Sequence, residues 1–285
     1  MKRAFTNAFT KETPFFFILP AILWQVIFFF IPLAIIIWFS IALLNEQGVW
    51  QGFTFQHYAG FFDLVYAKIL ARSFILALIN ATCCLFFAYP VAYFVARKIA
   101  KRKNFFLFLL TLPFWTNFLI QVYAWFFILE RNGLINTLLR KLGIITDPLQ
   151  LAHSLIAVFI VMLYCYLPFM IMPLYTSLEK LNVDLIEASY DLGATPWQTF
   201  YRVTVPLSMP GINTGFVLVF VLSFGEFVIP ALLGGAKFMF VGSLISYYFL
   251  VARDTFLGSA FTCLGAFVLL FFALAVLSIK RIWRR

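Results

Sequence analysis

Long runs of apolar residues dominate the chain, and short polar segments separate them. A helix needs about 20 apolar residues to cross the hydrocarbon core of a membrane. Six runs reach that length: residues 15–43, 69–96, 105–129, 151–175, 207–233 and 257–279. We therefore predict an all-α polytopic membrane protein with six transmembrane helices. A seventh run, residues 238–251, is too short to span and is predicted to be interfacial or re-entrant.

The positions of Lys and Arg predict the orientation of these spans. The N-terminal tail (residues 1–14), the segment after the second span, the loop at 176–206 and the C-terminus together carry 14 of the 21 basic residues. Because Lys and Arg concentrate on the cytoplasmic side of membrane proteins, we expect both termini in the cytoplasm. The rest of the chain, residues 15–285, is predicted to form a single transmembrane domain.

Composition excludes several classes of protein. Apolar residues make up 64% of the chain and charged residues only 11%, against about 25% in an ordinary soluble domain. A soluble, disordered or disulfide-rich protein is therefore excluded. The net charge of +10 does not indicate nucleic-acid binding, because the basic residues lie in short runs between the spans. No metal site or catalytic set is predicted, since the four cysteines lie within apolar runs and the two histidines are isolated.

The predicted cytoplasmic loop, residues 176–206, has an amphipathic pattern. Apolar residues recur at helical spacing at Leu178, Leu181, Leu185, Ala188 and Leu192. This spacing predicts a helix with one apolar face. Such an element is either an ordinary structured loop or a docking surface for a partner, and the pattern alone leaves both open.

Capping residues predict how this loop is divided. Asp184 and Glu187 have the spacing of a capping box at a helix start. Gly193 stands where a helix end favours a positive φ angle, and the segment Thr195-Pro196-Trp197-Gln198 has the features of a second helix start. Pro206 is expected to end the segment. The loop is thus predicted to fold as a helix, a tight glycine turn and a short second helix.

The same loop resembles a known motif. Glu187-Ala188-Ser189, three residues, Gly193, nine residues and Val203-Thr204-Val205-Pro206 resemble E-A-A-x3-G-x9-I-x-L-P. This EAA motif marks the permease subunits of bacterial ABC importers. Ser189, Val203 and Val205 depart from the motif by small changes in volume.

The resemblance implies the MetI-like fold of type I ABC importer permeases, in which this loop couples the permease to a cytoplasmic ATPase. It implies ATPase-coupling roles for Glu187, Ala188, Ser189, Gly193, Ala194, Trp197 and Pro206. Glu187 would make a polar contact or cap at the docking surface. Gly193 would set the turn, and Ala188, Ala194 and Trp197 would pack against the ATPase or within the hairpin.

Shorter segments resemble the permeases of spermidine/putrescine importers. They are residues 112–117, 167–170, 172–175, 225–230, 233–237 and 253–254. The resemblance implies polyamine transport across the bacterial cytoplasmic membrane by alternating access. It also implies a second, distinct permease subunit, two cytoplasmic ATPase subunits and an external substrate-binding protein, which would dock on residues 48–65 and 133–150. ATP and Mg would bind to the ATPase, and this chain would hold no cofactor.

Glu226 is the only carboxylate within the six predicted spans. A carboxylate inside a membrane is costly and is a candidate functional residue. A polyamine is a chain of ammonium groups on methylenes, which carboxylates and aromatic rings both accommodate. The candidates for a substrate path are Glu226, Trp115, Asn117, Tyr123 and Trp125. The alternatives are an ion pair of Glu226 with Lys237, Arg253 or Arg72, and ordinary packing of the aromatic rings.

Other functions remain as alternatives. The same importer class with another substrate is one, whether putrescine alone, another organic cation or an anion such as molybdate. Glu226 argues against an anion. A secondary transporter or a membrane enzyme is another. No segment matches the phosphate-binding pattern G-x-x-x-x-G-K-[ST], so the chain is expected to be a transport subunit and no enzyme, with ATP hydrolysed by a partner.

Overall fold

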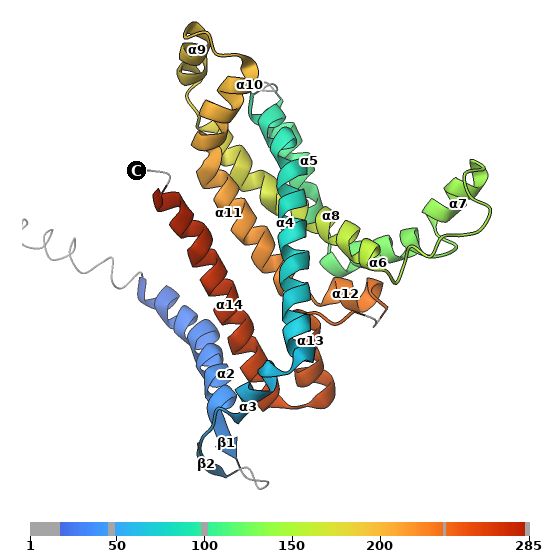
Figure 1. Ribbon diagram of the computed structural model, residues 1–285, viewed down its shortest axis with the longest axis vertical. Coiled ribbons are helices and arrows are strands. Elements are labelled where there is room, and N and C mark those ends of the chain that lie inside the picture. The colour runs from blue at the N-terminus through green and yellow to red at the C-terminus, as the bar shows by residue number, and fades with distance from the viewer. Residues whose placement is uncertain (1–17, 45–48, 98–101, 236–237, 283–285) are drawn as a thin grey trace, which may run out of the picture. The chain divides into compact units, whose positions relative to one another are not determined.

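The computed structural model describes residues 18–44, 49–97, 102–235 and 238–282 (Figure 1). Within these residues, six helices are long and apolar enough to cross a membrane: Ile18–Ile41, Leu64–Arg97, Phe118–Lys141, Leu155–Glu179, Pro196–Phe224 and Thr255–Val276. The predicted number of six spans is confirmed, while the third of these helices overlaps the predicted span at 105–129 only from residue 118 to residue 129. The predicted N-terminal tail lies outside the described residues, as does Lys237.

The chain divides into two compact units, and the first contains residues 1–62 and 247–266. Its described elements are η1 (Val26–Phe30), α2 (Ile31–Ile41), β1 (Ala42–Leu44), β2 (Trp50–Phe53), α3 (Gln56–Ala59), η2 (Gly60–Phe62), η4 (Tyr247–Ala252) and the first half of α14 (Thr255–Ile282). Phe261 is buried and packs its ring against Phe61 and Tyr248, with ring centroids 4.4 and 5.4 Å apart.

The β1–β2 hairpin was not expected from the sequence. Its strands are antiparallel, and they pair Ala42 with Phe53 and Leu43 with Gly52. The first predicted span, 15–43, therefore ends slightly early, at Ile41. Strands of three and four residues are too short to show the alternation of apolar and polar residues that indicates a strand.

The second unit contains residues 63–246 and 267–285. Its described elements are α4 (Leu64–Arg97), α5 (Lys103–Trp115), α6 (Phe118–Leu129), α7 (Leu134–Lys141), α8 (Leu155–Glu179), α9 (Val183–Asp191), α10 (Pro196–Thr199), η3 (Phe200–Thr204), α11 (Val205–Phe224), α12 (Val228–Leu233), α13 (Val241–Ser246) and the second half of α14. Helices α4, α8 and α11 pack on one another and form its core (Figure 1).

Glycines bring α8 and α11 close together. A Cβ atom added at Gly211 would lie 2.5 Å from Ser177 Cβ and 2.6 Å from the Pro173 carbonyl oxygen. One added at Gly215 would lie 2.7 Å from Met170 Sδ. Small residues of this kind let helix backbones approach closely in membrane proteins. The two helices are thus in direct backbone contact near the loop that joins them.

Buried hydrogen bonds fix α4 against α11. Asn80 Nδ2 donates to Ser223 Oγ at 2.8 Å, and the hydroxyls of Tyr89 and Ser208 lie 3.0 Å apart. Asn80 and Ser208 are fully buried. Hydrogen bonds between helices satisfy polar side chains that lipid and apolar side chains do not satisfy.

Two predicted spans are interrupted. The span predicted at 105–129 consists of α5 and α6, because Thr116 is extended and the Asn117 side chain caps α6 by accepting from Leu119 N at 2.9 Å. The span predicted at 207–233 consists of α11 and α12, with a turn at 225–227. Single capping residues within apolar runs cause both interruptions. The stretch at 238–251 contains α13 and η4, which are too short to span.

Candidate functional site

The loop between α8 and α11 forms a helical hairpin of α9, α10 and η3, called here the α9–α10 hairpin. Its first helix begins two residues earlier than predicted. The cap is Asn182, whose Oδ1 accepts from Asp184 N at 3.2 Å, and Val183 is the first helical residue. The predicted capping box of Asp184 and Glu187 is therefore wrong. Asp184 instead lies in the first turn, where its negative charge favours the helix N-terminus.

The glycine turn after α9 is confirmed. Gly193 has a φ of 81°, in the left-handed region that favours glycine. Gly193 N donates to Tyr190 O at 2.8 Å, and Ala194 N donates to Ser189 O at 3.0 Å. This pair of bonds is a Schellman motif, which satisfies the last carbonyls of a helix.

The second helix start is also confirmed, and the predicted stop at Pro206 is not. Thr195 and Gln198 form a reciprocal capping box around Pro196 at the first helical position. The helix then continues through the π turn η3 into α11, where Pro206 is the second residue. In η3, Val205 N donates to Phe200 O, five residues back. This wider turn accommodates the proline ring and its missing N–H.

Side chains anchor the hairpin to the end of α4. The Phe200 ring packs edge-on against Tyr89 and Tyr93, with centroids 5.5 and 6.4 Å apart. Arg97 Nη2 donates to Leu181 O at 2.9 Å. The hairpin region therefore contacts α4, in addition to being joined to α8 and α11 along the chain.

A further bond holds the two helices of the hairpin together. The hydroxyls of Ser189 and Thr199 lie 2.8 Å apart and are buried. Ser189, which replaces the second alanine of the EAA pattern, thus ties α9 to α10.

The outer face of the hairpin is apolar and uncovered within the described part of the chain. Leu192 is 89% exposed and Trp197 is 68% exposed, and Leu185 and Ala188 are also exposed. Glu187 is exposed between them, Ala194 is half-buried, and Pro206 is half-buried at the start of α11. Of the residues at helical spacing, Leu185, Ala188 and Leu192 therefore face outward, where a partner can contact them. Leu178 is buried in α8 and Leu181 precedes α9, so the predicted single apolar face does not extend to them.

A second polar site lies in the turn between α11 and α12. Glu226 is only 9% exposed. Its Oε1 accepts from Val228 N at 2.8 Å and Ile229 N at 3.1 Å, and its Oε2 accepts a hydrogen bond from the Tyr166 hydroxyl. An ionised carboxylate has about four acceptor positions. Three are occupied here, so one remains for a donor from outside the chain.

No cation pairs with Glu226 in the described residues, where the only ion pair is Lys103–Glu179 at 2.7 Å. The alternative pairing with Arg72 is therefore wrong. Pairing with Lys237 lies outside the described residues. The backbone at Glu226 is held by close packing, since a Cβ atom on Gly242 would lie 2.3 Å from Gly225 O and 2.8 Å from Glu226 O.

Tyr166 also lines a cavity of about 300 Å³, called here the aromatic cavity. The cavity is formed by α8, the interrupted pair α5 and α6, and α11. Its lining residues are Pro113, Phe114, Thr116, Phe118, Gln121, Tyr164, Cys165, Tyr166, Pro168, Phe169 and Leu222. Gln121 Nε2 donates to the Pro113 carbonyl and the Thr116 hydroxyl, and so closes the break between α5 and α6.

The predicted aromatic candidates do not line this cavity. Trp125 packs on Tyr164, with centroids 5.2 Å apart. Trp115 is exposed and packs on Phe108 of its own helix, and Tyr123 is exposed. Asn117 caps α6.

The aromatic residues that do line the cavity were missed by the sequence reasoning. Phe114 and Phe169 lie within the short segments that resemble polyamine permeases, and Tyr166 directly precedes one of them. The resemblance of those segments was the only signal in the sequence that pointed to these lining residues.

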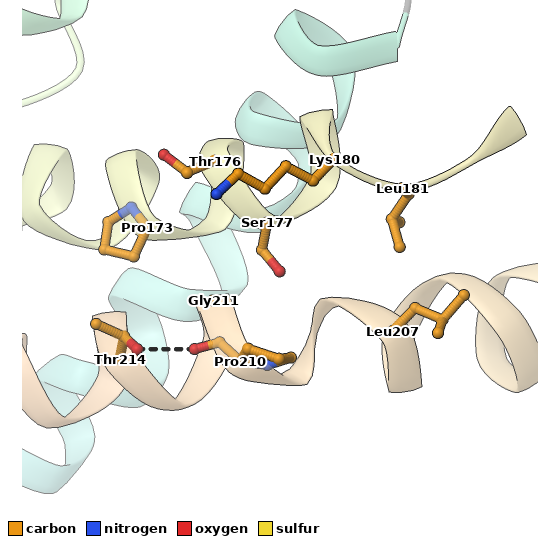
Figure 2. Close-up of a pocket in the computed structure, with 9 residues that line it drawn as sticks. All are labelled: Pro173, Thr176, Ser177, Lys180, Leu181, Leu207, Pro210, Gly211 and Thr214. Carbon is orange, nitrogen blue, oxygen red and sulfur yellow. Dashed lines mark hydrogen bonds between the residues drawn. The ribbon is translucent and has the colours of Figure 1, made fainter.

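A second cavity, of about 470 Å³, lies between α8 and α11 next to the hairpin. Figure 2 shows its lining: Pro173, Thr176, Ser177, Lys180 and Leu181 from the end of α8, and Leu207, Pro210, Gly211 and Thr214 from α11. The walls of this cavity are thus the two helices that the hairpin joins.

Comparisons with known proteins agree with this geometry. Residues 88–285 match the family model "Binding-protein-dependent transport system inner membrane component". The chain is 42% identical over 238 residues to the spermidine/putrescine transport system permease protein PotB of Salmonella typhimurium strain LT2, covering 83% of each chain. It is 41% identical over 238 residues to PotB of Escherichia coli K12, covering 83% of this chain and 86% of PotB.

A solved structure supports the same fold. The crystal structure of a bacterial ABC transporter involved in the import of the acidic polysaccharide alginate matches with a TM-score of 0.74 and 18% identity, over 98% of each chain. At this identity the likeness concerns the fold alone. Since the family model covers well over half of the chain, the protein is a permease subunit belonging to the family of inner membrane components of binding-protein-dependent transport systems.

Proposed function

We propose that this chain is a permease subunit of an ABC importer for polyamines, spermidine and/or putrescine. The observation that carries the proposal is Glu226, a buried carboxylate with no cation partner in the described residues. The relatives named as spermidine/putrescine permeases, at 41–42% identity, support the same substrate class. Family membership also rules out the secondary-transporter alternative, because this family works with a binding protein.

The site suits a polyamine in its chemistry. A polyamine presents ammonium groups separated by methylenes. Glu226 supplies a negative charge, and Tyr166 holds that carboxylate beside the aromatic cavity. The rings of Phe114, Phe118 and Phe169 offer both apolar surface for the methylenes and cation–π contacts for the ammonium groups. An anion such as molybdate would be repelled by the Glu226 carboxylate. The lining of this cavity contains no cationic side chain that could bind it.

The α9–α10 hairpin is proposed to couple the permease to the ATPase. We place both termini and the hairpin in the cytoplasm, on the distribution of Lys and Arg. The exposed apolar face at Leu185, Ala188, Leu192 and Trp197 then meets the ATPase, with Glu187 as its polar contact. Closure of two ATPase subunits moves the hairpin and, with it, α8 and α11. This movement alternates the access of the cavity between the two sides of the membrane.

The other partners follow from this arrangement. A second, distinct permease completes the transport path, and an external binding protein delivers the polyamine. The segment after α6 is a proposed docking surface for that protein. Asn136 is fully buried there and bonds to Leu149 N and Leu149 O at 2.9 Å and to Glu130 O at 3.2 Å. These bonds give the loop a fixed shape for binding.

The experiment is uptake by the assembled complex in proteoliposomes, with its binding protein and internal ATP. Labelled spermidine and labelled putrescine are tested separately, with labelled molybdate as the anion control. The proposal predicts ATP-dependent uptake of at least one amine and none of molybdate. The ratio of the two amines decides between a general polyamine importer and one for putrescine alone. Uptake of neither amine would overturn the proposed substrate.

A further inference from the structure

A groove of about 330 Å³ runs along one face of α4. Its lining consists of Arg72, Ile75, Leu76 and Ile79 from α4, Leu155 from the first turn of α8, and Phe238 and Phe240 before α13. The α4 residues follow the spacing i, i+3, i+4 and i+7, so they form one stripe along the helix. Only Arg72 in this lining carries a charge. The groove, called here the Arg72 groove, is therefore polar at one end and apolar along its length.

Arg72 has no protein partner for its charge. Within the described residues the only ion pair is Lys103–Glu179, and no hydrogen bond of Arg72 occurs there. A guanidinium within a membrane span is costly unless it pairs with an anion or reaches the interface. It also presents a planar fork of donors that matches a phosphate group. Arg72 thus presents a charge that the described chain does not neutralise and that an anion near the membrane surface can pair with.

The length of α4 places this groove across one leaflet. The helix has 34 residues, or about 51 Å at 1.5 Å per residue, against a hydrocarbon core of about 30 Å. With α4 centred in the bilayer, Arg72 lies about 13 Å from the midplane and Ile79 about 2 Å from it. The charged end of the groove is thus near the headgroup region, and its apolar end is near the middle of the membrane.

We propose that the Arg72 groove binds a phospholipid. The lipid phosphate pairs with the Arg72 guanidinium, and an acyl chain lies along Ile75 and Ile79, which are both exposed. From the membrane surface toward the midplane, the groove changes from charged to apolar, and so does a phospholipid from its headgroup to its acyl chains. With the α3 end of α4 on the outer side, the lipid belongs to the outer leaflet. The inference does not depend on which substrate is transported.

The apolar wall distinguishes a lipid from a free phosphate ion. A phosphate ion would use Arg72 alone and leave about 10 Å of helix face, from residue 72 to residue 79, uncovered. An acyl chain covers this face and gains apolar contact along it. Binding of a phospholipid therefore depends on Ile79, whereas binding of a soluble phosphate ion does not.

The test uses the assembled complex in bilayers of phosphatidylethanolamine and phosphatidylglycerol, with a trace of phosphatidylglycerol carrying a diazirine on its acyl chain. After illumination, labelled peptides are identified by mass spectrometry. We expect labelling of residues 75–79 and 238–240. Arg72→Gln is expected to reduce it about tenfold, as the loss of one charge-assisted hydrogen bond would. Ile79→Trp, which fills the apolar end, should reduce it as well. Arg72→Lys should retain most of it.

Arg102→Gln is the matched control, because Arg102 is an exposed arginine at the start of α5 outside the groove, and its labelling should equal that of the wild type. Equal labelling in wild type and Arg72→Gln would overturn the proposal. So would loss of labelling on adding excess inorganic phosphate, which would indicate a soluble anion. Absence of labelling at residues 75–79 and 238–240 in the wild type would overturn it too, because the groove would then hold no lipid.

Discussion

The α9–α10 hairpin and the Glu226 turn are both helix interruptions built from a glycine and a capping side chain, yet they differ in what their side chains contact. In the hairpin, Thr195 and Gln198 cap their own helix within three residues and remain exposed. In the turn, Glu226 caps α12 and is also bonded to Tyr166, 60 residues away on α8.

This difference indicates two separate roles. The caps of the hairpin are all local, and its apolar face is exposed, so that face is free for a partner. The Glu226 turn depends on another helix, so a displacement of α8 changes the surroundings of the carboxylate. The proposed coupling region and the proposed substrate contact thereby lie at different ends of the same helix pair, α8 and α11. Four substitutions test this separation.

Gly211→Leu should have the largest effect, because it disrupts the helix pair that connects both regions. Even a Cβ atom at this position would lie 2.5 Å from Ser177 Cβ. Overpacking of this kind costs about 3 kcal/mol. We expect a marked loss of thermal stability of the purified complex, measured by unfolding in detergent. Gly225→Ala is the control, since its Cβ would come no closer than 3.7 Å to another atom. Equal stability of the two variants would contradict the close α8–α11 contact.

Gly193→Val should uncouple the hairpin alone. A Cβ atom at this position would meet nothing within 4 Å. The substitution therefore destabilises the turn only through the left-handed φ of 81°, by about 1–2 kcal/mol. We expect uptake and binding-protein-stimulated ATP hydrolysis to fall together, by about tenfold. Gly193→Asn, which tolerates this conformation, should retain most activity. Equal uptake and ATP hydrolysis in Gly193→Val and Gly193→Asn would contradict the claim that coupling depends on the left-handed conformation of this turn.

Tyr166→Phe should affect the cavity and spare the hairpin. It keeps the ring that lines the cavity and removes the hydroxyl bonded to Glu226. A hydrogen bond to a charged group is worth about 1.5 kcal/mol, so polyamine uptake should fall about tenfold. Stimulated ATP hydrolysis should stay near the wild-type rate. A parallel loss of ATP hydrolysis would show that the two regions are not separate.

Lys103→Gln should have the smallest effect. Its ion pair with Glu179 joins α5 to the end of α8, but the two side chains are 44% and 39% exposed. Exposed pairs contribute under about 1 kcal/mol. Uptake is expected to stay within about twofold of wild type. A larger loss would mean that this contact, and not the hairpin, transmits the motion.

The sequence predicts the hairpin far better than the cavity. Gly193 and the Thr195–Gln198 capping box were predicted because their bonds join residues three or four apart. The errors at Asp184 and Pro206 are each local: Asn182 is a competing cap, and the π turn accommodates the proline. Local patterns of this kind can be recognised without knowing the fold.

The cavity depends on contacts between distant residues. The six spans were evident as apolar runs, but the breaks at 116–117 and 225–227 arise from single caps within such runs. Tyr166 meets Glu226 only after α8 packs on α11. In a chain with 39 phenylalanines, composition does not distinguish the rings that line the cavity from those that face lipid.

Glu226→Gln tests the central claim most directly, with polyamine uptake and ATP hydrolysis recorded in the same proteoliposomes. The substitution removes the charge and keeps a carbonyl oxygen to cap α12. Glu130→Gln serves as the control, since Glu130 is exposed at the end of α6. The account predicts that Glu226→Gln lowers uptake by at least about tenfold, as the loss of a hydrogen bond to a charged group would, while stimulated ATP hydrolysis is retained. Unchanged uptake would contradict it and make Glu226 a structural cap of α12.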